Sequence, residues 1–234
     1  MTLALYLHPL ASFCHKVLIA LYENETPFIG HVVDLADENA SAGFLDMWPV
    51  GKIPVLRDED ADRIVPETTI IIEYLDQNHP GPRPLFPRDG PARLDARLWD
   101  RFFDLHVQVP MQKIVTDRLR PDGEHDRRGV ADARGALGTA YDMIERQVAE
   151  RTWAIGDTFS VADCAAAPAL FYAGIVVPFA ETHPHVAAYF ERLLERPSFR
   201  RVIAEARPYF QLFPFREALP ARFLDEDFSS RTVG

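Results

Sequence analysis

The chain has 234 residues, of which 47% are hydrophobic and 26% are charged, and its formal net charge is −10. This composition is typical of a water-soluble globular protein, and the acidic charge argues against nucleic acid or an anionic membrane as the main partner. No stretch approaches the roughly 20 apolar residues of a membrane span, and the first residues lack the basic start and apolar core of a signal peptide. We therefore expect a cytoplasmic protein with no membrane association.

Two cysteines are present, Cys14 and Cys164. Their wide separation fits neither a metal-binding motif nor the disulfide framework of a small secreted domain. We expect no metal site, and the low cysteine content favours a reducing compartment.

Residues 1–80 alternate strand and helix signals. The periodicity and the turn residues predict strands over 2–7, 27–35, 53–56 and 63–65 and helices over 12–24, 40–48 and 66–78. The first strand-helix-strand unit implies a parallel pair, and the acidic turn between the last two strands predicts an antiparallel hairpin. The order β-α-β-α-β-β-α describes an α/β domain.

A stretch rich in proline and glycine follows, and we place a linker at 81–91. After it, residues 92–234 show no convincing strand and predict an all-helical domain, with helices over 92–109, 127–151, 160–177, 185–196 and 198–207. Pro110 should kink or end the first of these helices. The segment 160–177 is almost wholly apolar, which predicts a helix in the core, and the aromatic tail 209–228 should pack on the surface of the domain.

The motif GKIPVL places Pro54 at the mouth of a predicted strand. A cis bond between Ile53 and Pro54 would turn the backbone of Ile53 outward, where its N–H and C=O groups can pair with a short extended peptide. The alternative is an ordinary proline of an edge strand.

The motif PETTII places Glu67 and Thr68 at the start of a predicted helix. The unpaired N–H groups of a helix N-terminus bind a carboxylate, and Glu67 can meet an ammonium beside it. Together they would hold the zwitterionic end of an amino acid. The alternative is simple helix capping.

The motif SVAD, residues 160–163, resembles a capping box in which Asp163 replaces the usual glutamate. We interpret it as a structural start of the buried helix. Replacing Asp163 by alanine should cost about 1 kcal/mol or more.

These motifs in this order, together with SFCHKVLIAL at 12–21, resemble the cytosolic glutathione S-transferase superfamily over essentially the whole chain. The resemblance implies a thioredoxin-like N-terminal domain, glutathione as cosubstrate and a homodimer. It also implies that Ile53 with cis Pro54 binds the cysteinyl part of glutathione, that Glu67 and Thr68 hold its γ-glutamyl end, and that Lys52 reaches its glycine carboxylate.

Conjugation needs the thiolate of glutathione, and a thiol with a pKa of about 8.5 is mostly protonated at neutral pH. Lowering that pKa by about two units takes about 2.7 kcal/mol, which a hydroxyl and a helix N-terminus can supply together. Ser12 is therefore the expected catalytic residue. It lies one position after Ala11, which occupies the usual place of the family's serine, so backbone N–H groups and Cys14 stay open as alternative thiol activators.

The resemblance also implies a small, apolar second substrate in a pocket between the two domains. We expect the pocket to be lined by Leu10, Phe13, Phe103, His106, Val107 and Met111. The tail residues Phe210, Phe213 and Phe215 are candidates to cover it. For each of these residues the alternative is ordinary helix packing, and we expect His15 and Lys16 on the outer or interdomain side of their helix.

The predicted function is a glutathione transferase acting on a hydrophobic electrophile or a peroxide. A glutathione-binding scaffold or stress-related interaction protein with low turnover is the alternative from another class, since fold alone does not decide function. A glutathione-dependent isomerase and a thiol-disulfide reductase that uses Cys14 are the less favoured alternatives.

Overall fold

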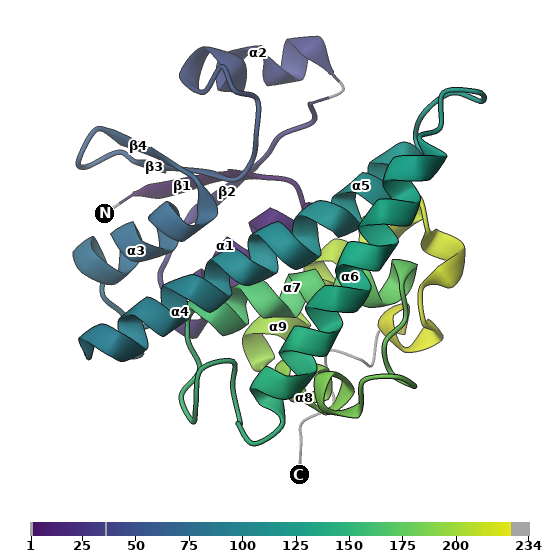
Figure 1. Cartoon of the computed structure of the whole chain (residues 1–234). Coiled ribbons are helices and arrows are strands. Elements are labelled where there is room, and N and C mark those ends of the chain that lie inside the picture. The colour runs from purple at the N-terminus through teal and green to yellow at the C-terminus, as the bar shows by residue number, and fades with distance from the viewer. Residues whose placement is uncertain (1, 36, 226–234) are drawn as a thin grey trace.

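The computed structural model describes residues 2–35 and 37–225, and it begins with a four-stranded mixed sheet (Figure 1). The strands are β1 (Leu3–Leu7), β2 (Ile29–Val32), β3 (Val55–Asp58) and β4 (Arg63–Pro66), in the spatial order β2-β1-β3-β4. β1 pairs with β2 in parallel, whereas β1 with β3 and β3 with β4 are antiparallel. The predicted parallel unit and the predicted hairpin are both confirmed.

Three helices cover the two faces of this sheet (Figure 1). They are α1 (Ser12–Glu23), α2 (Glu38–Met47) and α3 (Thr68–Asn78). Leu5 of β1 belongs to the core shared with α1 and α3, whereas its neighbour Tyr6 packs on the other side with Phe44 of α2. This alternation along β1 follows from the two-residue period of a strand, and it completes the thioredoxin-like fold.

The rest of the described chain is helical (Figure 1). It comprises α4 (Gly90–Phe102), the π-helical segment η1 (Phe103–Gln108), α5 (Val109–Asp117), α6 (Arg127–Val148), α7 (Val161–Val176), α8 (Pro184–Leu194), α9 (Pro197–Ala206) and the 3₁₀ turns η2 (Arg207–Leu212), η3 (Arg216–Ala218) and η4 (Ala221–Phe223). No helix in the ranges 2–35 and 37–225 is long and apolar enough to cross a membrane.

Pro110 neither ends nor interrupts the helical path from α4 to α5. It lies in the first turn of α5, directly after the π-helical segment. A π turn shifts the hydrogen-bonding register of a helix, and proline is tolerated where a helical segment begins because its missing N–H would be unpaired there. The sequence showed the proline but not the change of register that accommodates it.

α7 is the central helix of the second domain, as its apolar sequence predicts. It packs against α1 of the first domain and against α4, so one continuous core joins the two parts. The capping box is confirmed: the Asp163 carboxylate accepts a bond of 2.9 Å from the Ser160 N–H, and the Ser160 hydroxyl accepts one from the Ala162 N–H. The start of α7 is therefore specified locally.

The aromatic tail packs on the second domain over the part that the structure describes. Phe223 makes an edge-to-face contact with Phe171 of α7, and Phe213 lies against Tyr172 with ring centres 5.3 Å apart. The expected surface packing of the tail is confirmed up to residue 225, and the remainder of the expected segment lies outside the described residues.

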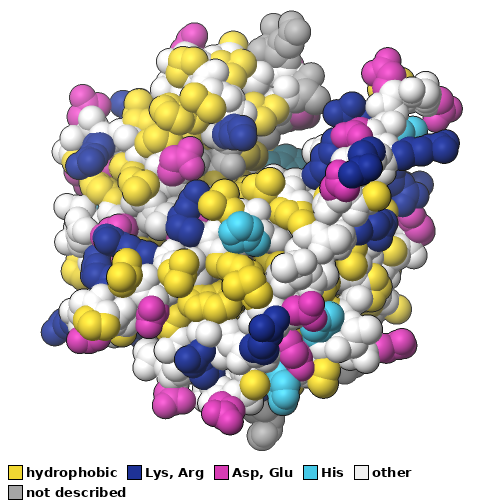
Figure 2. All heavy atoms as spheres, viewed as in Figure 1, with side chains coloured by type: hydrophobic (Ala, Val, Ile, Leu, Met, Phe, Trp, Pro, Cys, Tyr) yellow, Lys and Arg dark blue, Asp and Glu magenta, His cyan; other side chains and the backbone are white. Residues whose placement is uncertain are grey.

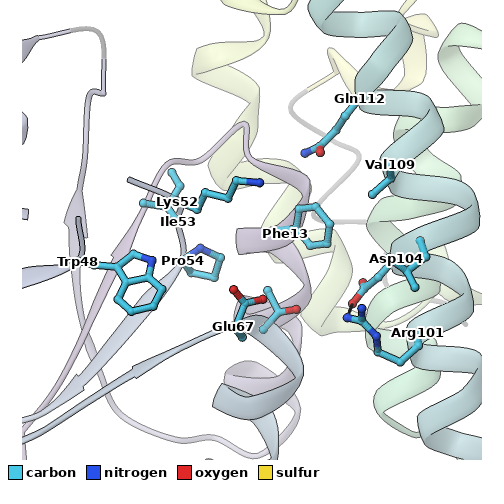
Figure 3. A pocket seen from close by; sticks show the side chains of 12 residues that line it. Phe13, Trp48, Lys52, Ile53, Pro54, Glu67, Arg101, Asp104, Val109 and Gln112 are labelled. Atoms are coloured by element: carbon cyan, nitrogen blue, oxygen red, sulfur yellow. Dashed lines mark ion pairs between the residues drawn. The ribbon is translucent and has the colours of Figure 1, made fainter. Parts of the chain in front are cut away.

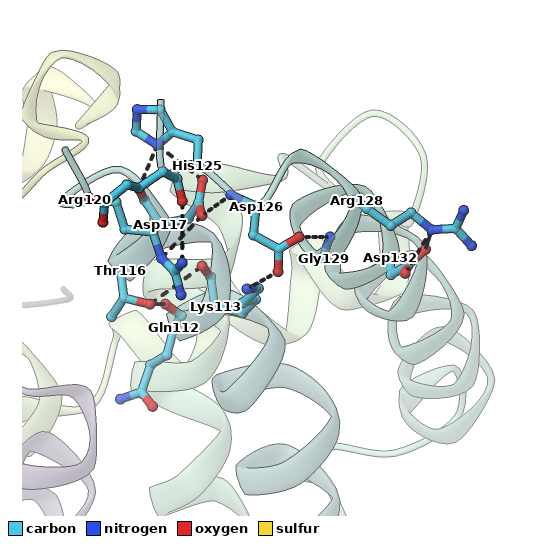
Figure 4. Close-up of polar contacts among 11 residues, drawn as sticks. Gln112, Lys113, Thr116, Asp117, Arg120, His125, Asp126, Arg128, Gly129 and Asp132 are labelled. Atoms are coloured by element: carbon cyan, nitrogen blue, oxygen red, sulfur yellow. Dashed lines mark hydrogen bonds and ion pairs between the residues drawn. The ribbon is translucent and has the colours of Figure 1, made fainter. Parts of the chain in front are cut away.

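The turn between α5 and α6 is held by two aspartates (Figure 4). The Asp117 carboxylate accepts the Asp126 N–H, and the Asp126 carboxylate caps α6 by accepting the Gly129 N–H at 2.8 Å and pairs with Lys113. A Cβ atom at Gly129 would lie 2.2 Å from the Asp126 carboxylate oxygen and 2.6 Å from Lys113. Glycine suits this position because the Asp126 cap and Lys113 occupy the space that a side chain at residue 129 would need.

Candidate active site

A pocket of about 260 Å³ lies between the thioredoxin-like domain and the helices α4 and α5 (Figure 3). Residues from four separate stretches of the sequence line it: Phe13, Trp48, Lys52, Ile53, Pro54, Glu67, Thr68, Arg101, Asp104, Leu105, Val109 and Gln112. One wall thus brings together all five predicted glutathione-binding residues, and the other wall comes from the helical domain.

The Ile53–Pro54 peptide bond is cis, as the family resemblance implies, whereas the motif alone left it open. Pro54 directly precedes β3, and no hydrogen bond joins the backbone of Ile53 to another described residue. The N–H and C=O groups of Ile53 therefore remain available at the pocket wall to pair with an extended peptide.

Glu67 precedes the first residue of α3 and has a positive φ angle of 68°, a conformation uncommon for residues other than glycine. Its side chain forms no capping hydrogen bond with the helix. Simple capping therefore does not account for Glu67, and its carboxylate lines the pocket beside the first turn of α3 (Figure 3). A carboxylate next to unpaired helix N–H groups suits a zwitterion.

The helical wall of the pocket differs from the expected one. Phe103, Val107 and Met111 are fully or almost fully buried in the core. The pocket is instead lined by Arg101, Leu105 and Val109, which repeat every four residues along the adjacent face, together with Asp104 and Gln112. The apolar spacing indicated a buried face correctly, but a buried face and a ligand-lining face of one helix have the same period.

Two further predicted pocket residues lie elsewhere. His106 is exposed and packs on the Phe102 ring at 5.1 Å, and Leu10 is half-buried against the core. Neither lines the described pocket, whereas Phe13 does. The tail residues Phe210, Phe213 and Phe215 also do not line it, because the tail packs on the core around α7.

Ser12 is the first residue of α1, and its residue surface is only 4% exposed. Ser12 does not line the pocket, whereas its neighbour Phe13 does. Neither Ser12 nor Phe13 donates its backbone N–H to a carbonyl of another described residue. Two candidate activators thus lie together at this helix start, a largely buried hydroxyl and two unpaired N–H groups.

Cys14 is fully buried, and this burial raises the pKa of its thiol to about 12. Burial also raises the pKa of Cys164 well above its usual value. A buried, protonated thiol is a poor nucleophile, so the structure gives no support to a reductase that uses Cys14.

In native protein at neutral pH, we expect an aromatic disulfide reagent to label neither thiol. In the urea-unfolded chain, the same reagent should label both thiols within minutes. The reason is that each side chain is inaccessible and protonated in the folded state. The measurement is absorbance of the released thiolate with and without urea. Rapid labelling of one thiol in the native protein, lost in a Cys14→Ala variant, would contradict this account.

Lys16 lies on the interdomain side of its helix, one of the two expected positions, and not on the outer side. It is completely buried, and its ammonium lies 2.6 Å from Asp100, 2.8 Å from Asp104 and 3.2 Å from the Thr69 hydroxyl. Burial alone would lower the pKa of Lys16, but the two carboxylates raise it above its ordinary value. A charged cluster therefore joins α1, α3 and α4 behind the pocket, whose wall includes Asp104.

His15 is also completely buried, and its Nε2 lies 2.5 Å from the Pro9 carbonyl oxygen. Burial lowers its pKa to about 4, so it is neutral at physiological pH. Since it does not line the pocket, nothing in the geometry gives it a role in chemistry.

Sequence reasoning missed half of the pocket lining: Trp48, Arg101, Asp104, Leu105, Val109 and Gln112. The four-residue spacing of Arg101, Leu105 and Val109 was the signal available for the helical wall. No local pattern marked Trp48.

Comparisons with known proteins match both parts of the chain. The glutathione S-transferase N-terminal domain model matches residues 11–78, and the C-terminal domain model matches residues 102–197. Glutathione S-transferase GstB of Escherichia coli K12 is 28% identical over 193 residues, which cover 80% of this chain and 91% of GstB. A stringent starvation protein A homolog of Coxiella burnetii is 28% identical over 207 residues, covering 87% of this chain and 92% of that protein.

Two solved structures are similar in fold and sequence. A glutathione S-transferase from Methylobacterium radiotolerans in complex with glutathione sulfonate has a TM-score of 0.74 and 28% identity, covering 86% of this chain and 94% of the other. FzlA from C. crescentus has a TM-score of 0.75 and 28% identity, covering 87% and 92%.

Proposed function

Because this chain belongs to the glutathione S-transferase family, we propose that it is a glutathione transferase that activates the thiol of glutathione for attack on a small hydrophobic electrophile or a peroxide. The observation that carries the proposal is one wall of the pocket. There the free backbone of Ile53, beside a cis proline, lies next to the uncapped carboxylate of Glu67 at the start of α3.

The charged and polar groups along glutathione are complementary to those along this wall of the pocket. The backbone of Ile53 pairs with the cysteinyl residue, as a strand edge pairs with an extended peptide. Glu67 takes the ammonium of the γ-glutamyl group, and the N–H groups at Thr68 take its carboxylate. Lys52, on the other side of Ile53, takes the glycine carboxylate.

This orientation directs the thiol toward Phe13 and the start of α1. There the Ser12 hydroxyl or the unpaired first-turn N–H groups donate a hydrogen bond to the sulfur and favour its thiolate. The thiolate attacks the electrophilic carbon, the C–S bond forms, and the leaving group departs with its electron pair. The electrophile occupies the space between Phe13 and Val109, with the Gln112 amide at one side (Figure 3), and Leu105 lines the same pocket.

The binding step is tested by replacing Glu67 with glutamine. We expect affinity for glutathione to fall roughly 10- to 100-fold, because a charge-assisted hydrogen bond to a ligand ammonium contributes about 1.5–3 kcal/mol. The measurement is calorimetric titration. Glu59→Gln, the same change at an exposed residue after β3, is the control and should leave affinity unchanged. Equal affinity in both variants would remove Glu67 from the site.

The activation step is tested in the same titration by reading the ultraviolet absorbance of the bound thiolate. If Ser12 activates the thiol, Ser12→Ala binds glutathione but shows no thiolate at neutral pH. If thiolate absorbance persists in this variant, backbone N–H groups are the activators. If wild type binds no glutathione, the proposed function is wrong.

A glutathione-binding protein with little turnover is the second candidate function. It is favoured by the position of the Ser12 hydroxyl, which does not line the pocket. Relatives named stringent starvation protein A and FzlA show that similar chains carry names other than transferase. Glutathione binding without turnover across halogenated arenes, epoxides and peroxides would select this candidate.

We also propose that the chain forms a homodimer through the face of α3 and α4. Glu73 of α3 pairs with Arg93 and Arg97 of α4, and the apolar side chains of Leu94 and Leu98 next to these arginines are 68% and 60% exposed. Figure 2 shows hydrophobic side chains gathered on the face in view, over the helices of the second domain. Exposed apolar area of this kind is typical of an interaction surface.

Sedimentation equilibrium is expected to give a dimer for wild type and a monomer for Leu98→Glu, because the substitution buries a charge in the interface. Leu119→Glu is the matched control, since Leu119 is 69% exposed in the turn after α5. A wild-type monomer, or equal dissociation of both variants, would contradict this interface.

A further inference from the structure

We propose that Arg101 binds the α-carboxylate of the γ-glutamyl group, so that the helical domain completes the glutathione site within a single chain. This inference rests on the proposed function and adds a binding residue to it. It gives the γ-glutamyl end of the ligand a cation that the thioredoxin-like domain does not supply.

Arg101 reaches the pocket from α4, on the wall opposite Glu67 and Thr68 (Figure 3). Its side chain is 53% exposed and forms no hydrogen bond with another described residue. Its nearest carboxylate belongs to Asp104, at 3.6 Å. The N–H donors of its guanidinium are therefore free to bind a carboxylate in two parallel bonds, the geometry that this group favours.

The Asp104 carboxylate does not neutralise the positive charge of Arg101. Its carboxylate lies 2.8 Å from the buried ammonium of Lys16, a closer contact than the one to Arg101. The Lys16 ammonium, which is itself held by Asp100, therefore fixes Asp104 from behind the pocket wall. We therefore assign Asp104 as a positioning residue that orients the Arg101 guanidinium along the wall. Lys16 neutralises most of the negative charge of Asp104.

The charges of the ligand require a second cation at this end. Glutathione carries one ammonium and two carboxylates at neutral pH, and the described lining contains two basic side chains, Lys52 and Arg101. Lys52 lies on the Ile53 side of the wall, where the glycine end is placed. At the other end the α-carboxylate lies next to the negative Glu67, so the N–H groups at Thr68 alone would hold it against a like charge. Arg101 offsets that repulsion.

The test is calorimetric titration of the full chain with two thiols that differ by this one carboxylate. The probes are glutathione and 4-aminobutanoyl-cysteinylglycine, which keeps the ammonium, the thiol and the glycine carboxylate. We expect Arg101→Gln to weaken glutathione binding roughly tenfold or more and to leave binding of the analogue unchanged. Arg101→Lys should restore part of the loss, because it keeps the charge without the bidentate geometry.

The controls separate this inference from the proposed function and from misfolding. Arg128→Gln, at an exposed residue of α6, should bind both thiols as wild type does. The thermal unfolding midpoint of Arg101→Gln should match that of wild type. Equal weakening of both thiols by Arg101→Gln, or no weakening of either, would overturn the role of Arg101 while leaving glutathione binding intact. If wild type binds neither thiol, the proposed function fails and this inference fails with it.

Discussion

Replacing Lys16 by methionine is expected to lower the free energy of unfolding by about 3–5 kcal/mol. Methionine fills a similar volume but removes the cation that lies between Asp100 and Asp104. Two carboxylates would then be buried together without a counter-charge, and Oδ1 of Asp104 already lacks a hydrogen-bond partner among the described residues. Chemical denaturation followed by circular dichroism measures the change.

The control for Lys16→Met is Arg128→Met, which removes the cation of the exposed pair with Asp132 on α6. Solvent screens that pair, so the loss should stay below about 0.5 kcal/mol. A second comparison replaces Asp100 and Asp104 by asparagine in the Lys16→Met background. It should recover part of the stability, because the uncompensated charges are removed. A loss below about 1 kcal/mol for Lys16→Met would mean that the cluster does not hold the domains together.

Replacing Asp163 by alanine is expected to lower the free energy of unfolding by at least about 3 kcal/mol. This exceeds the cost of an ordinary helix cap because the fully buried carboxylate accepts four hydrogen bonds. They come from the N–H groups of Ala154 and Ser160 at 2.9 Å each, the Ser160 hydroxyl at 3.0 Å and the Tyr189 hydroxyl at 2.6 Å. Each donor would remain buried and unpaired in the variant.

Ser160→Ala is the matched variant for Asp163→Ala. It removes the cap hydroxyl but keeps the carboxylate and its other donors, so its cost should be about 1 kcal/mol. Denaturation curves of the two variants and wild type give the comparison. Similar losses in both variants would show that Asp163 acts as a cap alone and that its bonds to Ala154 and Tyr189 contribute little.

The sequence alone was sufficient for the features that depend on neighbouring residues. Turn residues and periodicity predicted the order of strands and helices, because these signals act within a few positions. The motif around Pro54 and the capping box at Ser160 and Asp163 were readable for the same reason. Two such motifs contain the five residues that the family resemblance assigns to glutathione, and the structure brings all of them to one pocket.

Tertiary packing decided which residues face the ligand and which charges are buried. Phe103 and Leu105 lie two positions apart on one helical stretch, yet the first packs in the core and the second lines the pocket. Only the neighbours of the helix assign its faces, since an apolar stripe suits either surface equally. Lys16 is buried because Asp100 and Asp104 meet it from a distant helix. No local pattern contains that pairing, since its energy depends on contacts that exist only after the two domains have packed together.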